Sequence, residues 1–358
     1  MLARATSSAS GTSDDSHPLV DGSVSQPHEY REAERTLTRL LDLMHRGRLP
    51  AQLLPLLDNF HAAVSAEPAW RCHLLALSND ELGVIFDGLA DPLEPSIAVA
   101  FSSTCKGLRT PLQAPLEVLK QRHTKAKALW SKTDTLESLA SMRDAACLTW
   151  EERDLTADDM ATLSMLLRTA GLQKLDEIAV VGSHFGDAGV QALCEGLAYS
   201  SLSNICLEDN NIGTAGAEAL GATFRSGGLP DLEVLSLGGN RIGKQGVAAL
   251  AEPLRKQPRL RLLDFSGCEI GDEGVAALVD NLGKDDFKAL EQLWLQHCGL
   301  TDVGCATLVS ALDNGGLLRT RIHGIVNRRN TNPDASEAAC QAVVDAKERA
   351  RARRRGRR

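Results

Sequence analysis

Residues 232–250 read Leu232-Glu-Val-Leu235-Ser-Leu237-Gly-Gly-Asn240-Arg-Ile242-Gly-Lys-Gln-Gly246-Val-Ala-Ala-Leu250, and this arrangement recurs along the chain. If the first leucine is position 0, every copy has apolar residues at positions 3 and 5, glycine at 14 and leucine at 18. The copies start 27 to 30 residues apart, at Leu175, Leu202, Leu232, Leu260 and Leu290. A fixed period of this length predicts stacked structural repeats.

Apolar residues at positions 0, 3 and 5 fit a short strand with one buried face, and the residues from about position 11 fit a helix. Position 8 holds Ser183, Asn210, Asn240, Cys268 and Cys298. The pattern resembles the leucine-rich repeat, in its long, ribonuclease-inhibitor-like form. The resemblance implies an α/β fold, a right-handed solenoid with parallel strands on the concave side and helices outside. It also implies that the position-8 residue hydrogen-bonds the neighbouring coils, and that the surface binds macromolecules.

A degenerate copy extends the pattern upstream. Setting position 0 at Ala145 places Leu148, Trp150 and Leu163 at apolar positions. We therefore expect about six repeats within residues 145–333, with the poor match from Leu317 to Ile325 as a C-terminal cap. Glycine at position 14 predicts close approach of helix and sheet. Gly213, Gly243 and Gly271 at position 11 predict a backbone that is free to turn away from the strand layer.

The remaining chain divides by composition. Residues 1–28 are rich in Ser, Thr, Gly and Asp and predict a disordered tail. Apolar residues at helical spacing predict a helical segment at 29–75 and a linker helix within 116–144. Residues 334–358 predict a basic helix or tail. A small all-α domain would thus precede the repeats.

Residues 76–115 carry a second resemblance. Leu77, Glu81, Leu82, Ile85, Phe86 and Leu89, followed by Cys105-Lys106, resemble an F-box. The resemblance implies docking on a Skp-type adaptor of a cullin ubiquitin ligase, with the repeats left to bind a substrate. The implied docking residues are Leu77, Leu82, Ile85, Phe86 and Leu89. The alternative is that these helices only cap the solenoid, because solenoid ends need polar-faced caps.

Composition limits the setting of the chain. No apolar run reaches the ~18–20 residues of a membrane span, and the nine cysteines form no Cys-x-x-Cys pair. These features predict a reducing, cytoplasmic and/or nuclear location. The net charge is −8, but the last twelve residues carry +7 and the rest −15. The basic end suggests a nuclear address or a weak nucleic-acid contact, whereas the acidic body argues against nucleic acid as a partner.

No catalytic constellation is found. Gly238 to Gln245 imitates a phosphate-binding loop, but Gln245 cannot supply the hydroxyl that holds magnesium. His297, Cys298 and Cys305 lack a second pair at zinc spacing. We expect no enzyme activity, no cofactor and no metal. Ran GTPase-activating proteins share the repeat type and leave a GTPase regulator as a remote alternative.

Outward strand positions predict the binding surface. They are acidic along much of the array, with only Arg261 nearby, which predicts a basic partner segment. Trp294 is either exposed for binding or packed under the C-terminal cap. The candidate residues are Glu151, Glu177, Glu208, Asp209, Asp264, Trp294, Gln296 and His297.

Overall fold

The computed structural model describes residues 79–355, apart from 104–105, 134–135, 170–171, 173, 284 and 326–331. The expected tail at 1–28, the helical segment at 29–75 and Leu77 lie outside the described residues. The strands are β1 (Cys147–Glu151), β2 (Glu177–Val181), β3 (Asn204–Cys206), β4 (Val234–Ser236), β5 (Leu262–Asp264), β6 (Gln292–Trp294) and β7 (Arg321–His323). The helices are α4 (Asn79–Leu89), α5 (Ser96–Ser103), α6 (Lys106–Trp130), η2 (Leu139–Asp144), α7 (Ala157–Thr169), α8 (Gly186–Leu197), α9 (Thr214–Arg225), α10 (Gly243–Arg255), α11 (Gly271–Val279), α12 (Asp302–Asp313) and α13 (Glu337–Arg355).

The strands form one seven-stranded parallel sheet in chain order. Each of β2 to β6 begins two residues after a repeat leucine, and β1 begins two residues after Ala145. The period therefore predicts these strands correctly, including the degenerate first one. The seventh strand, β7, lies in the poorly matching segment that was expected to cap the array.

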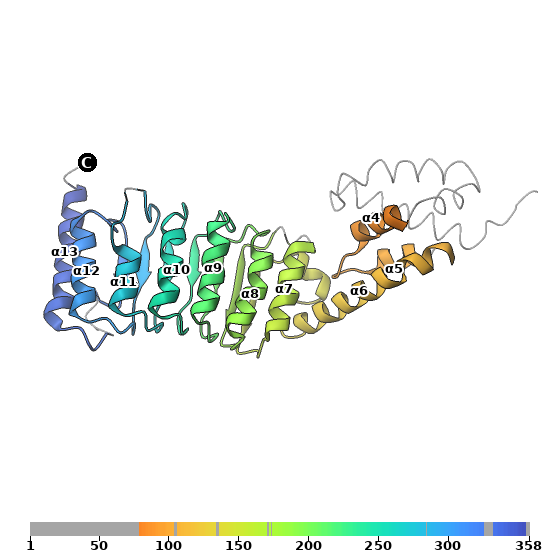
Figure 1. Ribbon diagram of the computed structural model, residues 1–358, viewed down its shortest axis with the longest axis horizontal. Helices are drawn as coiled ribbons and strands as arrows, with labels where there is room; N and C mark the ends of the chain where they lie inside the picture. Colours follow the sequence, from red (N-terminus) through yellow and green to blue (C-terminus); the bar gives the residue numbers. More distant parts are fainter. Residues whose placement is uncertain are drawn as a thin grey trace, which may run out of the picture.

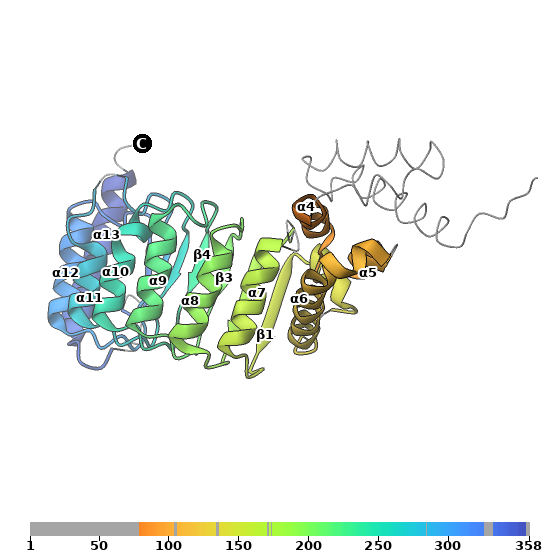
Figure 2. The same cartoon turned by 45° about the vertical axis from the view of Figure 1, so that its right-hand side comes forward.

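Helices cover one face of the sheet. Helices α7 to α12 lie side by side along the array, and α13 packs against α12 at the C-terminal end (Figures 1 and 2). Between helices and sheet runs a continuous apolar core built from repeat positions 3, 5, 10 and 18. Leu235, Leu237, Ile242 and Leu250 represent one coil of this core, and none is measurably exposed. Each coil thus buries its apolar side by stacking on the next.

Position 8 joins neighbouring coils, as expected. The Asn240 carboxamide accepts hydrogen bonds from the backbone N–H groups of Asn210 and Ile212, at 3.0 and 2.9 Å. Its amide group donates to Leu207 O at 2.7 Å. Cys268 and Cys298 occupy the same position, and each thiol donates to a carbonyl of the preceding coil. Burial raises the pKa of both thiols to about 12, which fits a structural role.

Gly216, at position 14, has a different reason from the one expected. Gly216 is crowded by Ile212 of its own coil and by Asp187 of the preceding one, because a Cβ there would lie 2.7 Å from each. Asp187 accepts hydrogen bonds from the N–H groups of Gly213 and Gly216 at the start of α9. The glycine therefore makes room for a contact between helices, and not for a contact between helix and sheet.

The N-terminal helices depart from the expected boundaries. Residues 106–130 form a single helix, so the division between an F-box-like segment and a linker helix at 115/116 falls inside α6. Ala126 and Leu129, near the end of α6, belong to the same core as Leu148 and Trp150 of the first coil. The last part of α6 therefore acts as the N-terminal cap of the sheet and helix stack.

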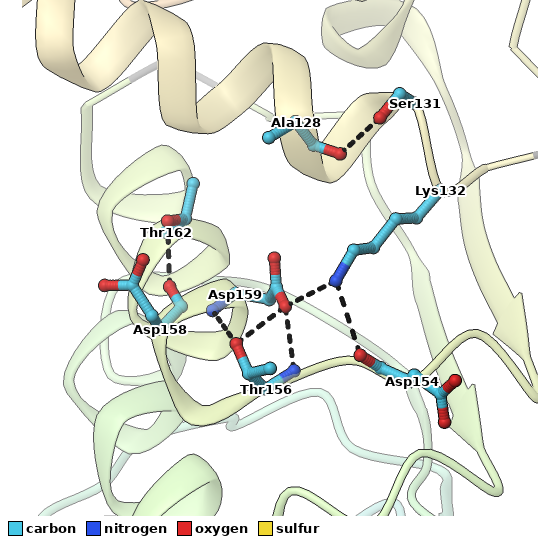
Figure 3. Close-up of polar contacts among 8 residues, drawn as sticks. All are labelled: Ala128, Ser131, Lys132, Asp154, Thr156, Asp158, Asp159 and Thr162. Atoms are coloured by element: carbon cyan, nitrogen blue, oxygen red, sulfur yellow. Dashed lines mark hydrogen bonds and ion pairs between the residues drawn. The ribbon is translucent and has the colours of Figure 1, made fainter.

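Polar contacts fix this cap to the first coil (Figure 3). Lys132, just after α6, donates to Asp159 Oδ2 at 2.8 Å and to Asp154 O at 3.3 Å. Asp159 also accepts from the N–H and hydroxyl groups of Thr156, each at 2.8 Å, and so caps α7. Although burial opposes ionisation, the hydrogen bonds from Lys132 and Thr156 lower the pKa of Asp159.

Helix α13 closes the other end of the array. Lys347 is buried, and its ammonium group donates to Leu317 O at 2.8 Å. Arg349 and Arg353 both contact Asp313 at the end of α12, and Arg349 holds the pKa of that carboxyl below its usual value. Part of the basic C-terminal segment is thus used in packing against the last coil.

Candidate functional site

The side of the sheet away from α7 to α12, called the open face below, displays rows of side chains in register. The position-4 row runs through Thr149, Ala179, Cys206, Ser236, Asp264, Trp294 and His323. Neighbouring strands lie roughly 4.8 Å apart, so side chains in one row are close enough to act together. Most of the outward side chains are partly exposed, unlike the buried positions 3 and 5.

Two carboxylates meet over β4 at the centre of the open face. The Ser236 hydroxyl donates to Glu208 Oε1 at 2.6 Å and lies 3.4 Å from Asp264 Oδ2. The Cys206 thiol donates to the same Glu208 oxygen at 3.3 Å, and the Ser266 N–H donates to Asp264 Oδ1 at 2.7 Å. We call Glu208, Ser236 and Asp264 the acidic centre.

The acidic centre is not neutralised within the described part of the chain. Burial, with the Glu208 charge as a smaller cause, raises the pKa of Asp264 despite its hydrogen bonds to Ser266 and Ser236. Neither Glu208 nor Asp264 takes part in an ion pair with a described residue. Arg261, the one basic residue expected nearby, pairs with Glu233 and Glu291 instead.

An aromatic pair lies next to the acidic centre. Trp294 is opposite Asp264 in the register, and its ring stacks on His323 of β7 with centroids 4.6 Å apart. Its indole N–H donates to Gln292 Oε1 at 3.2 Å. Burial and the nearby Arg321 charge lower the pKa of His323, against a smaller opposing effect of the Asp264 charge. Trp294 therefore packs against the last coil while remaining partly exposed on the open face.

The remaining candidates occupy the rim and the neighbouring rows. Asp209 and His297 are exposed at position 7, where the backbone is left-handed, with φ of 55° and 51°. Gly239 takes the same position in the next coil, and a Cβ there would overlap the Asp209 carboxylate. Gln296 accepts a hydrogen bond from the Ser266 hydroxyl at 2.8 Å. Glu151 and Glu177 lie on β1 and β2, away from the acidic centre.

The structure brings Glu208, Asp264, Trp294 and Gln296 into one area that reaches from the centre of the open face toward its C-terminal end, and it adds Ser236 and His323. Ser236 is an outward residue that charge and aromatic size did not single out. His323 could not be placed from the sequence, because its coil lacks the repeat pattern. Arg321 was missed for the same reason, and it is the exposed basic residue of β7.

The implied adaptor-docking residues take a different place. Leu82, Ile85, Phe86 and Leu89 are all buried, with at most 6% of each side chain exposed. An adaptor needs exposed apolar side chains, so these four cannot dock on one in this conformation. They are buried because α4 packs against α5 and α6. Val84 on α4 is instead exposed, at 55%.

Two features are absent from the described part of the chain. No helix there has both the length and the apolar character needed to cross a membrane. No group of three or more His, Cys, Asp or Glu side chains there is placed to hold a metal ion.

The repeat pattern of this chain is shared with known proteins. Residues 228–251 and 258–279 match a family model described as "Leucine Rich repeat". This chain contains leucine-rich repeats. It is also similar to the mouse protein "NACHT, LRR and PYD domains-containing protein 12", with 27% identity over 246 residues. That match covers 68% of the chain but only 17% of the mouse protein, so the chain spans about a sixth of the length of this relative.

The repeats fix what kind of surface the chain offers. Leucine-rich-repeat arrays present an extended face built from outward strand positions, and the sheet here has that form, with α7 to α12 covering its other face. Such repeats suggest a protein-interaction module.

Proposed function

We propose that this chain is a non-catalytic protein-binding module, and that its open face binds a basic segment of a partner protein. The observation that carries the proposal is the acidic centre, where two partly buried carboxylates have no cationic partner among the described residues. A positively charged partner segment would supply the missing charge and be attracted by it.

Trp294 would serve as the anchor of the interface. Aromatic residues that are already packed lose little conformational freedom on binding, and tryptophan is enriched among binding hot spots. The stack on His323 holds the Trp294 ring in one position beside Asp264. Charge and aromatic surface would thus be offered together, with charge giving specificity and the ring giving affinity.

Affinity purification with mass spectrometry tests this proposal. The full chain, Trp294→Ala and Tyr199→Ala would each be used as bait under the same conditions. Tyr199 is a matched control, because it is an aromatic residue with 71% exposure located just after α8, away from the open face. We expect Trp294→Ala to lose the captured partner, by about tenfold or more for a hot-spot residue, and Tyr199→Ala to keep it. Equal capture by the three baits would contradict the proposal.

A second candidate function is the F-box-like adaptor role. The resemblance at residues 77–106 favours it, and so does the packing of α4, α5 and α6 into a small helical unit. The burial of Leu82, Ile85, Phe86 and Leu89 opposes docking through those residues. The alternative is a leucine-rich-repeat scaffold or regulatory binding protein in which the helices only cap the array.

The same purification separates these two readings. A substrate adaptor would capture a Skp-type protein, and Val84→Asp, which alters an exposed valine on α4, would lose it without unfolding the chain. A scaffold would capture no Skp-type protein with either bait. Substitution of Phe86 would be a poor test, because it would remove a core side chain.

A further inference from the structure

The acidic centre and the aromatic pair form one composite surface with a defined chemistry. We propose, resting on the function proposed above, that the open face binds an extended partner segment through an arginine and an aromatic or aliphatic residue. The arginine guanidinium would lie between Glu208 and Asp264, and the apolar residue would lie on Trp294.

In the acidic centre, one hydroxyl proton faces two carboxylates, so one of them receives no hydrogen bond from that hydroxyl. The Ser236 hydroxyl has one proton, and its shorter contact, 2.6 Å, is with Glu208 Oε1. The second contact, 3.4 Å to Asp264 Oδ2, then has no proton of its own. Neither Asp264 Oδ2 nor Glu208 Oε2 receives another donor from a described residue. Two carboxylate oxygens on opposite sides of one hydroxyl are thus left for solvent or for a ligand.

Gly238, which is buried and has no side chain, lies beside the two carboxylates. A Cβ on Gly238 would lie 3.6 Å from Glu208 Cγ and 3.7 Å from Asp264 Oδ2. The nearest atom to that Cβ would be Ser266 O, at 3.4 Å, so an added methyl group would touch the backbone of the next coil and both acidic side chains at ordinary van der Waals distance.

Guanidinium fits this arrangement better than ammonium. It is planar, it presents five N–H donors in a fixed fork, and it can bond two carboxylates at once. Guanidinium also stacks on aromatic rings, and Trp294 is the next residue in the row after Asp264. Lysine would supply a compact charge without the second set of directed donors.

The positions of the acids and of Trp294 on the open face set the spacing of the two contacts. Carboxylates lie on β1, β2 and β5 and just after β3, through Glu151, Glu177, Asp264 and Glu208, whereas the outward side chains of β6 and β7 include no acid. Ser236 and Trp294 are two strands apart, roughly 10 Å at the usual strand spacing. An extended segment advances about 3.3 Å per residue, so the arginine and the apolar residue should be about three positions apart.

Selection from a displayed library of random ten-residue peptides on the full chain tests this inference. We expect enrichment of arginine about three positions from an aromatic or aliphatic residue.

The Glu208→Gln/Asp264→Asn double variant should lose the arginine preference, with selected peptides binding about tenfold more weakly or worse. Gly238→Ala keeps both carboxylates and should lower the same preference, because its methyl group would lie against both acidic side chains. Glu218→Gln, which changes an exposed acid on α9, is the matched control and should select the same peptides as the intact chain.

The outcomes distinguish this inference from the function on which it rests. Selected peptides without an arginine preference, or a preference that survives in the double variant, would overturn the inference. An absence of selected peptides, with a partner still captured in a Trp294-dependent way, would overturn the inference and leave protein binding in place. If no partner were captured and no peptide selected, both would fall. Circular dichroism melting of each variant would confirm that it is folded.

Discussion

Asp264 lowers the folding stability of the protein when no partner is bound. Its carboxylate is partly buried and lies near Glu208, and its hydrogen bonds come from Ser266 and, at 3.4 Å, from Ser236. Burial without a cationic partner opposes ionisation. A side chain in this state destabilises the fold at neutral pH, and a bound cation would remove that cost.

Asp264→Asn is therefore expected to melt at a temperature equal to or higher than that of the intact chain at pH 7. Asparagine keeps an acceptor for the Ser266 N–H and carries no charge. Because the pKa of Asp264 is raised in the folded state, its ionisation costs stability above that pKa. The difference between variant and intact chain should shrink as the pH falls through the raised pKa toward 3.8. Melting followed by circular dichroism between pH 7 and pH 4 would measure it, and a lower melting temperature for the variant at pH 7 would contradict this account.

How far the sequence predicts the site depends on the register of each residue. Glu208, Asp264 and Trp294 lie at outward positions of well-matched copies, so counting from the repeat leucine places them on the open face. Ser236 carries no charge, and only the structure shows that it bridges two carboxylates. His323 lies in a coil without the leucine pattern, so its stack on Trp294 depends on strand pairing that the sequence does not display.

Among the helices, α6 joins two packing environments. Its last turns, with Ala126 and Leu129, contribute to the core of the repeat array. Its earlier part packs against α4 and α5. Pro111 and Pro115 lie within the first three turns of α6, and the helix continues through both although each proline removes a backbone donor.

Leu129→Ala on α6 is expected to destabilise the repeat array itself. Leu129 is fully buried, and removing a buried leucine side chain costs about 2–5 kcal/mol of unfolding free energy. Val118→Ala, at a position of α6 with 46% exposure, should change it by less than about 0.5 kcal/mol. Urea unfolding followed by tryptophan fluorescence would report the change, because Trp150 is buried in the first coil. An array that unfolds at the same urea concentration in both variants would show that α6 is not its cap.

Taken together, the coils, the two caps and the open face form one stacked structure. Helix α6 covers its first coil and α13 its last, each fixed by a buried core and by ion pairs at the surface. This stacking explains why the repeat positions predict nearly all of the array. The packing of α6 and α13 on the end coils does not follow from the repeat pattern. Each end coil has another repeat on one side only. On the other side it packs against a helix, so its sequence there does not have to keep the repeat pattern.

Site-specific photo-crosslinking would show directly whether the partner binds the open face. A photoreactive amino acid would replace Gln296 on the open face or Glu218 on α9, and the full chain would be irradiated with its captured partner. Gln296 is partly exposed beside the acidic centre, whereas Glu218 is exposed on the helical side. We expect a covalent partner adduct from position 296 and none from position 218. An adduct from position 218 with none from position 296 would contradict it.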